Sequence, residues 1–74
     1  MKTLQLEYIK RRRQTLGISL QEMAEWLGFK NASTYLKYEA GTYAFKAEQL
    51  PGLAGILNCE INDFFAQKVA KTAI

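Results

Sequence analysis

Apolar residues recur at intervals of three and four along most of the chain, which is the spacing of one buried face on an α-helix. Glycines, a single proline and short polar stretches separate these periodic segments. The pattern therefore predicts an all-α fold. We expect a compact bundle of five short helices near residues 4–16, 19–27, 31–40, 49–57 and 60–65.

The second and third of these helices carry clear start and stop signals. Ser19 and Glu22 have the spacing of a capping box, in which the hydroxyl and the carboxylate each accept a backbone N–H. Asn31 can cap the next helix with its side chain. Gly28 lies between the two helices and can adopt the positive φ of a tight turn. Two helices joined in this way predict a helix-turn-helix unit, whose second helix enters the DNA major groove.

Length and composition restrict the classes of protein to consider. The chain has 74 residues and 49% hydrophobic content, which predicts one globular domain at 1–66 with a tail at 67–74. No apolar run reaches the roughly 18 residues of a membrane span, and the charged start does not read as an export signal.

The cysteine and histidine content narrows the chemistry further. One cysteine and no histidine rule out an internal disulfide and histidine-based catalysis, and they leave almost no room for a zinc site. A single cysteine is typical of a reducing compartment. We therefore expect a cytoplasmic protein that is not an enzyme and needs no cofactor, metal, membrane or small-molecule substrate.

Positive charge is concentrated in the first two-thirds of the chain. The net charge is +3, and residues 1–46 hold eight of the ten Lys and Arg residues but four of the seven acidic ones. The remainder is slightly acidic. This asymmetry indicates an anionic partner that binds the first part of the domain.

Three stretches carry a resemblance to a known family. They are RRRQTLGISLQEMAEWLG, YLKYEAG and LPGLAGILNCEINDFF. Residues 6–65 resemble the lambda-repressor-like, Cro/C1 or XRE-family DNA-binding domain. The resemblance implies a five-helix bundle that binds operator sites in double-stranded DNA. It also implies a transcriptional regulator, which we expect to be a repressor of phage or mobile-element type.

The resemblance also implies roles for individual residues. Arg13 and Glu39 occupy the positions of a structural ion pair. The residues implied to face the bases are Asn31, Ala32, Ser33, Thr34 and Lys37. The residues expected at DNA phosphates are Arg11, Arg12, Gln21, Lys30 and Lys46. Gln21 is included because this chain has Leu20 where the family usually has a glutamine that contacts phosphate.

Two questions stay open at this point. Trp26 lies off the apolar stripe of its helix, and it is either a half-exposed aromatic beside Met23 and Lys30 or a contact for another chain or for the tail. The fold could also serve as a protein-interaction module that binds or masks another regulator. If the chain binds operator DNA, we expect a weak homodimer that pairs on paired half-sites.

Overall fold

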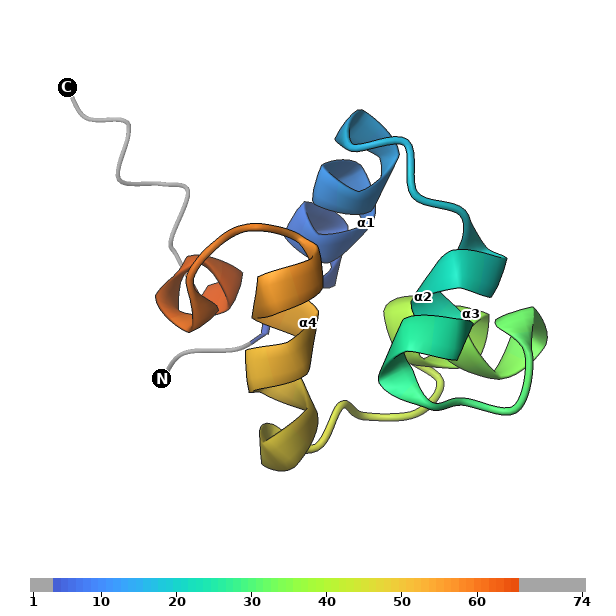
Figure 1. The fold of residues 1–74 in the computed structure, drawn as a ribbon. Helices are drawn as coiled ribbons and strands as arrows, with labels where there is room; N and C mark the ends of the chain where they lie inside the picture. The colour runs from blue at the N-terminus through green and yellow to red at the C-terminus, as the bar shows by residue number, and fades with distance from the viewer. Residues whose placement is uncertain (1–3, 66–74) are drawn as a thin grey trace, which may run out of the picture.

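The computed structural model describes residues 4–65, which are helical apart from their turns and connecting segments (Figure 1). Four α-helices are present in this range, namely α1 (Leu6–Thr15), α2 (Leu20–Leu27), α3 (Ala32–Glu39) and α4 (Leu50–Ile56). Two 3₁₀ turns accompany them, η1 (Ala47–Gln49) and η2 (Ile61–Phe65). The predicted all-α fold is confirmed, and the expected tail at 67–74 lies outside the described residues.

The count of five α-helices was wrong, because the last segment forms the 3₁₀ turn η2. Its five residues are too few to close more than one α-helical hydrogen bond, and short runs commonly adopt the tighter 3₁₀ geometry. Asp63 supports the turn twice. Its backbone N–H donates to the Glu60 carbonyl at 2.9 Å, and its carboxylate accepts from the Glu60 N–H at 3.0 Å.

Every α-helix and η2 contribute to one hydrophobic core. The core residues are almost fully buried, and they are Ile9, Met23, Ala24, Tyr35, Leu53, Ala54, Leu57 and Phe64. In Figure 1, α2 and α3 lie together on one side of the molecule, η2 lies on the other, and α4 lies between them. No helix among residues 4–65 is long and apolar enough to cross a membrane.

The start of α2, the turn after it and the start of α3 follow the local signals in the sequence. The Ser19 hydroxyl accepts from the Glu22 N–H at 3.0 Å, and the Glu22 carboxylate accepts from the Ser19 N–H at 2.9 Å. Gly28 has a φ of 82°. The Phe29 N–H donates a hydrogen bond to the Ala24 carbonyl at 2.8 Å, and this bond ends α2. The Asn31 side chain accepts from the Thr34 N–H at 2.9 Å. The predicted capping box, turn glycine and N-cap are therefore confirmed.

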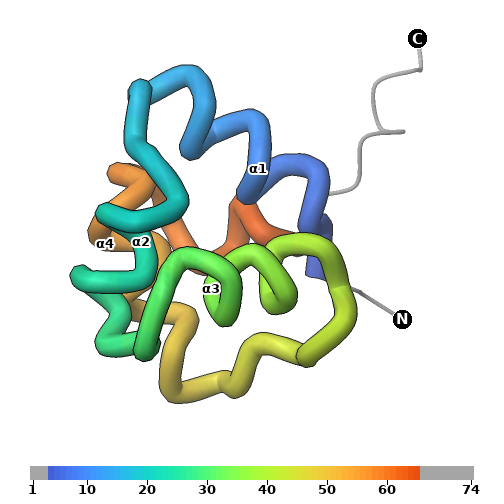
Figure 2. The backbone as a smooth tube through the Cα atoms, turned by 90° about the vertical axis from the view of Figure 1, so that its right-hand side faces the viewer, coloured from blue at the N-terminus to red at the C-terminus, as the bar shows by residue number. Residues whose placement is uncertain are grey.

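Helix α3 lies at the surface of the bundle. Figure 2 views the side of the molecule on which α2 and α3 lie, and it shows α3 at the front with residues 41–46 passing below it. Aromatic rings fill the space between α3 and its two connecting segments. Phe29 stacks on Tyr38 with ring centroids 4.7 Å apart, and Tyr38 also packs against Phe45 at 5.5 Å. This packing supports one face of α3 and leaves the opposite face open.

Candidate nucleic-acid interface

The side chains of α3 divide into a buried and an exposed face. Tyr35 and Glu39 are buried, whereas Ser33, Leu36 and Lys37 are exposed. Residues three and four apart share a face of an α-helix, so these three exposed side chains lie together. We refer to Ser33, Leu36 and Lys37 as the outward face of α3. Ala32 and Thr34 border it and are partly buried.

A buried network of Arg13, Glu39 and Tyr35 attaches α3 to α1. The Arg13 guanidinium donates to both Glu39 carboxylate oxygens, from Nε to Oε2 at 2.8 Å and from Nη2 to Oε1 at 3.1 Å. The structure therefore contains the ion pair that the family resemblance implies. The Tyr35 hydroxyl donates to Oε2 at 2.9 Å, and Arg13 Nη1 donates to the Ile18 carbonyl at 3.0 Å. The Glu39 side chain is 2% exposed, so the pair is shielded from solvent.

The protonation states of this network follow from its surroundings. Burial, together with the neighbouring Glu39 carboxylate, raises the pKa of Tyr35 far above its usual value. The hydrogen bonds that Arg13 donates to the Glu39 carboxylate raise the pKa of Arg13 above its usual value. Tyr35 therefore remains a protonated donor, and Arg13 remains charged. Two charge-assisted bonds from Arg13 hold α3 against α1, and the Tyr35 hydroxyl bond fixes the Glu39 carboxylate within α3.

The start of α3 is organised by Asn31. Its Oδ1 atom accepts from both the backbone N–H and the hydroxyl of Thr34, each at 2.9 Å. Two of the residues implied to face bases are therefore bonded to each other, through the Asn31 oxygen. Asn31 is exposed at the N-terminal end of α3, and Ser33 and Lys37 are exposed within the helix, whereas Ala32 and Thr34 are partly buried.

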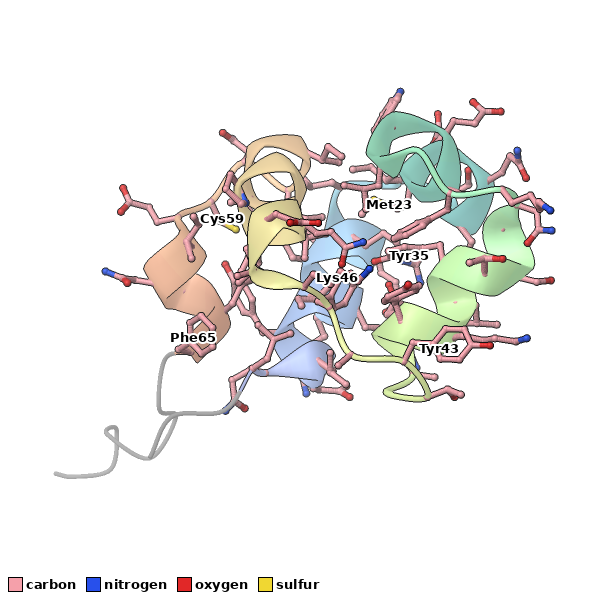
Figure 3. The ribbon with its side chains drawn as sticks, turned by 90° about the horizontal axis from the view of Figure 1, so that it is seen from below. Met23, Tyr35, Tyr43, Lys46, Cys59 and Phe65 are labelled. Carbon is pink, nitrogen blue, oxygen red and sulfur yellow. The ribbon has the colours of Figure 1, made fainter. Side chains whose placement is uncertain are left out.

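Four of the five expected phosphate contacts are exposed, namely Arg11, Gln21, Lys30 and Lys46. Arg11 Nε lies 3.5 Å from a Glu7 carboxylate oxygen, with both side chains about 70% exposed (72% and 69%). Gln21 donates to Glu25 at 3.0 Å. Lys46 lies on the segment that joins α3 to α4, as Figure 3 shows.

Arg12, which was expected at phosphate, donates to backbone carbonyls after α4. Its Nε atom donates to the Leu57 carbonyl at 2.9 Å, and Nη2 donates to the Asn58 carbonyl at 3.1 Å. These carbonyls follow the end of α4, where backbone acceptors have no partner within the helix. Arg12 is partly buried there and connects α1 to the C-terminal end of α4.

Two exposed residues beside the implied site were missed by the sequence reasoning. Leu36 is 44% exposed on the outward face, and it borders a groove against α1 together with Leu6 and Lys10. Tyr43 is 46% exposed on the segment after α3 (Figure 3). The spacing of Leu36 from Ser33 was a usable signal, because residues three apart share a helix face. Nothing local marked Tyr43.

Two residues outside α3, Trp26 and Cys59, differ in their exposure to solvent. Trp26 is 56% exposed on α2, which fits both a half-exposed aromatic and a contact for another chain. Cys59 packs partly buried against the core, and burial raises the pKa of its thiol. Residues 4–65 contain no group of three or more His, Cys, Asp or Glu side chains that could hold a metal ion.

Comparison with known proteins gives one result that bears on this surface. The chain matches a family model described as helix-turn-helix over residues 9–64. No curated protein and no solved structure matched the chain. The family match covers α2, the turn and α3, together with the elements that hold them. The chain therefore belongs to the helix-turn-helix family of Cro/C1, or lambda-repressor-like, type, a family of DNA-binding regulatory domains.

Proposed function

We propose that this protein binds double-stranded DNA in a sequence-specific manner through the outward face of α3. We further propose that it regulates transcription as a repressor of phage or mobile-element type. The observation that carries the proposal is that Glu39 is buried and paired. Glu39 is the only acidic residue of α3, and it is buried and paired with Arg13. The exposed part of α3 therefore presents only the positive charge of Lys37, which favours approach to an anionic polymer.

The side chains around the outward face suit the readout of base edges. The Lys37 ammonium can donate to the O6 and N7 acceptors of guanine, and the Ser33 hydroxyl can donate or accept. Asn31, Ala32 and Thr34 belong to the same proposed surface, at the start of α3. The Asn31 oxygen already serves as the cap of α3, so its amide nitrogen is the group available to a base.

The proposed phosphate contacts are Arg11, Gln21, Lys30 and Lys46. Lys30 precedes α3 and Lys46 follows it, and both side chains are exposed. Arg11 and Gln21 would have to exchange their exposed partners, Glu7 and Glu25, for phosphate oxygens. That exchange costs little, because an exposed ion pair contributes about 0–1 kcal/mol and a side-chain hydrogen bond on a helix surface about 0.2–0.5 kcal/mol. Arg12 is left out of the proposal, since its guanidinium is engaged at the end of α4.

Selection of bound sequences from a pool of random duplexes tests the proposal directly. Enrichment of a defined motif by the wild-type chain is the expected result. The preferred duplex then serves for all affinity measurements on variants. Recovery of a random set of sequences would remove sequence-specific binding from the proposal.

Replacing Lys46 by alanine should weaken binding to the preferred and the scrambled duplex by the same factor. The reason is that a phosphate contact carries no sequence information, while its loss reduces the number of released counterions by about one. The measurement is affinity for both duplexes across a salt series. The slope of log affinity against log salt should decrease by about one. A loss confined to the preferred duplex would instead place Lys46 at a base.

In the absence of DNA we expect a monomer or a weak dimer. One helix-turn-helix unit offers few base contacts, and proteins of this kind bind two half-sites about 34–36 Å apart. Pairing on DNA would therefore supply affinity that a single unit lacks. Sedimentation of the free protein at nanomolar concentration checks this expectation, and a tight dimer under those conditions would contradict it.

A second candidate function is suggested by Trp26. Its exposed ring lies on α2, and a large exposed aromatic is a common feature of protein–protein contacts. The chain could then bind or mask another regulator. Replacing Trp26 by serine should leave DNA affinity unchanged under the first function, and it should abolish capture of a protein partner under the second.

A further inference from the structure

Tyr43 makes three contacts with the C-terminal half of α3. The backbone N–H of Tyr43 donates to the Lys37 carbonyl at 3.2 Å. Its ring packs edge-on against Tyr38, with centroids 5.4 Å apart. The Lys37 ammonium lies over the same ring, with Nζ 5.7 Å from the centroid. The residue is thus anchored by its backbone and by its ring contact with Tyr38, while the Lys37 ammonium lies over its ring.

The contact with Tyr43 restricts the conformations of Lys37, the side chain on which the proposed base readout depends most. A free lysine has four rotatable bonds and can reach several phosphates or bases from one helix position. A cation over an aromatic face is attracted by the ring quadrupole, which favours the conformers that keep the ammonium there. The ammonium has three donors in total. It can keep this contact and still donate to an acceptor.

We propose that Tyr43 is a positioning residue for Lys37 and thereby a determinant of sequence specificity. The inference rests on the proposed DNA binding through α3. In the free protein the ring directs the ammonium toward the segment 41–46, at the C-terminal end of the outward face. Lys37 then meets one base pair of the bound duplex in preference to its neighbours. Without the ring, the Lys37 side chain is still charged, but its ammonium can donate to any of several acceptors.

Tyr43→Leu removes the aromatic face while keeping a bulky apolar side chain, and Tyr43→Phe removes only the hydroxyl. The readout is discrimination, defined as the affinity for the preferred duplex divided by that for a duplex changed at the Lys37-dependent base pair. Tyr43→Leu should reduce this ratio by about 2- to 5-fold, which is the range of exposed cation–π contacts. Tyr43→Phe should retain the wild-type ratio. Trp26→Leu is the matched control, an exposed aromatic of α2 whose loss should leave the ratio unchanged.

A second readout needs no DNA. The ε-methylene protons of Lys37 should show an upfield NMR ring-current shift in wild type and in Tyr43→Phe, and Tyr43→Leu should lose it. Melting temperatures should be similar for all variants, because Tyr43 is almost half exposed.

Three results would overturn the inference. The first is an unchanged discrimination ratio in Tyr43→Leu. The second is a discrimination ratio that falls as far in Tyr43→Phe as in Tyr43→Leu, because the hydroxyl and not the aromatic face would then set the discrimination. The third is the absence of the ring-current shift in wild type. A wild-type chain without any preferred duplex would be a different failure, since it removes the proposed function itself.

Discussion

Replacing Glu39 by alanine is expected to lower the free energy of unfolding by about 3 kcal/mol. The change leaves the Arg13 guanidinium, whose side chain is 11% exposed, without the carboxylate that accepts two of its hydrogen bonds. It also leaves the Tyr35 hydroxyl without its acceptor. An uncompensated charge and an unsatisfied donor inside the protein are both costly. Urea unfolding of wild type and variant measures the loss.

The chain provides a matched control for this experiment. Glu7 pairs with Arg11 on the surface of α1, where both side chains are largely exposed. Glu7→Ala should therefore change stability by no more than about 0.5 kcal/mol. Tyr35→Phe removes one hydroxyl from the buried network and should fall between the two, near 1 kcal/mol. If Glu39→Ala melted at the wild-type temperature, the ion pair would contribute nothing to holding α3 on α1.

Replacing Lys37 by alanine is expected to weaken binding to the preferred duplex by about 1–3 kcal/mol and to relax the preference at one base pair. The physical reason is the loss of donors to base acceptors, which a mismatched duplex does not offer in the same place. The loss on a scrambled duplex should be smaller, because only the nonspecific charge contribution disappears there. Affinity for both duplexes at several salt concentrations gives the two losses separately.

The comparison of Lys37→Ala with Lys46→Ala decides between base readout and phosphate contact. Equal weakening of both duplexes by Lys37→Ala would make Lys37 a phosphate contact only. Binding that neither variant changes would mean that α3 and the segment after it do not face DNA. In that case the protein-interaction function suggested by Trp26 would become the stronger proposal.

The parts of this fold that were correctly predicted from the sequence depend on neighbours in the chain. The capping box joins Ser19 to Glu22, and the Asn31 cap joins residues three apart. Gly28 adopts the positive φ that a glycine tolerates without strain. Helical periodicity also places Tyr35 and Lys37 on different sides of α3, one buried and the other exposed. Such features are readable because every partner lies within about one turn of helix.

Residues 60–65 show where a prediction from the local apolar pattern fails. Apolar residues at helical spacing in EINDFF predicted an α-helix, and the chain forms the 3₁₀ turn η2. The spacing of residues three apart suits both kinds of helix, so the pattern alone does not distinguish them. Phe64 is buried in the core all the same, because that contact depends on the apolar face and not on the type of turn.

The three consecutive arginines show what only the tertiary structure decides. Arg11 is exposed beside Glu7, Arg12 is bonded to carbonyls at the end of α4, and Arg13 is bonded to Glu39 on α3. Helical geometry turns successive side chains by about 100°, so it determines that the three must diverge. It does not determine what each will meet, because the carbonyls that accept from Arg12 and the carboxylate that accepts from Arg13 lie 26–46 residues away in the chain. The family resemblance supplied the partner of Arg13, whereas the role of Arg12 and the place of Tyr43 over α3 depend on how the segments after α3 pack.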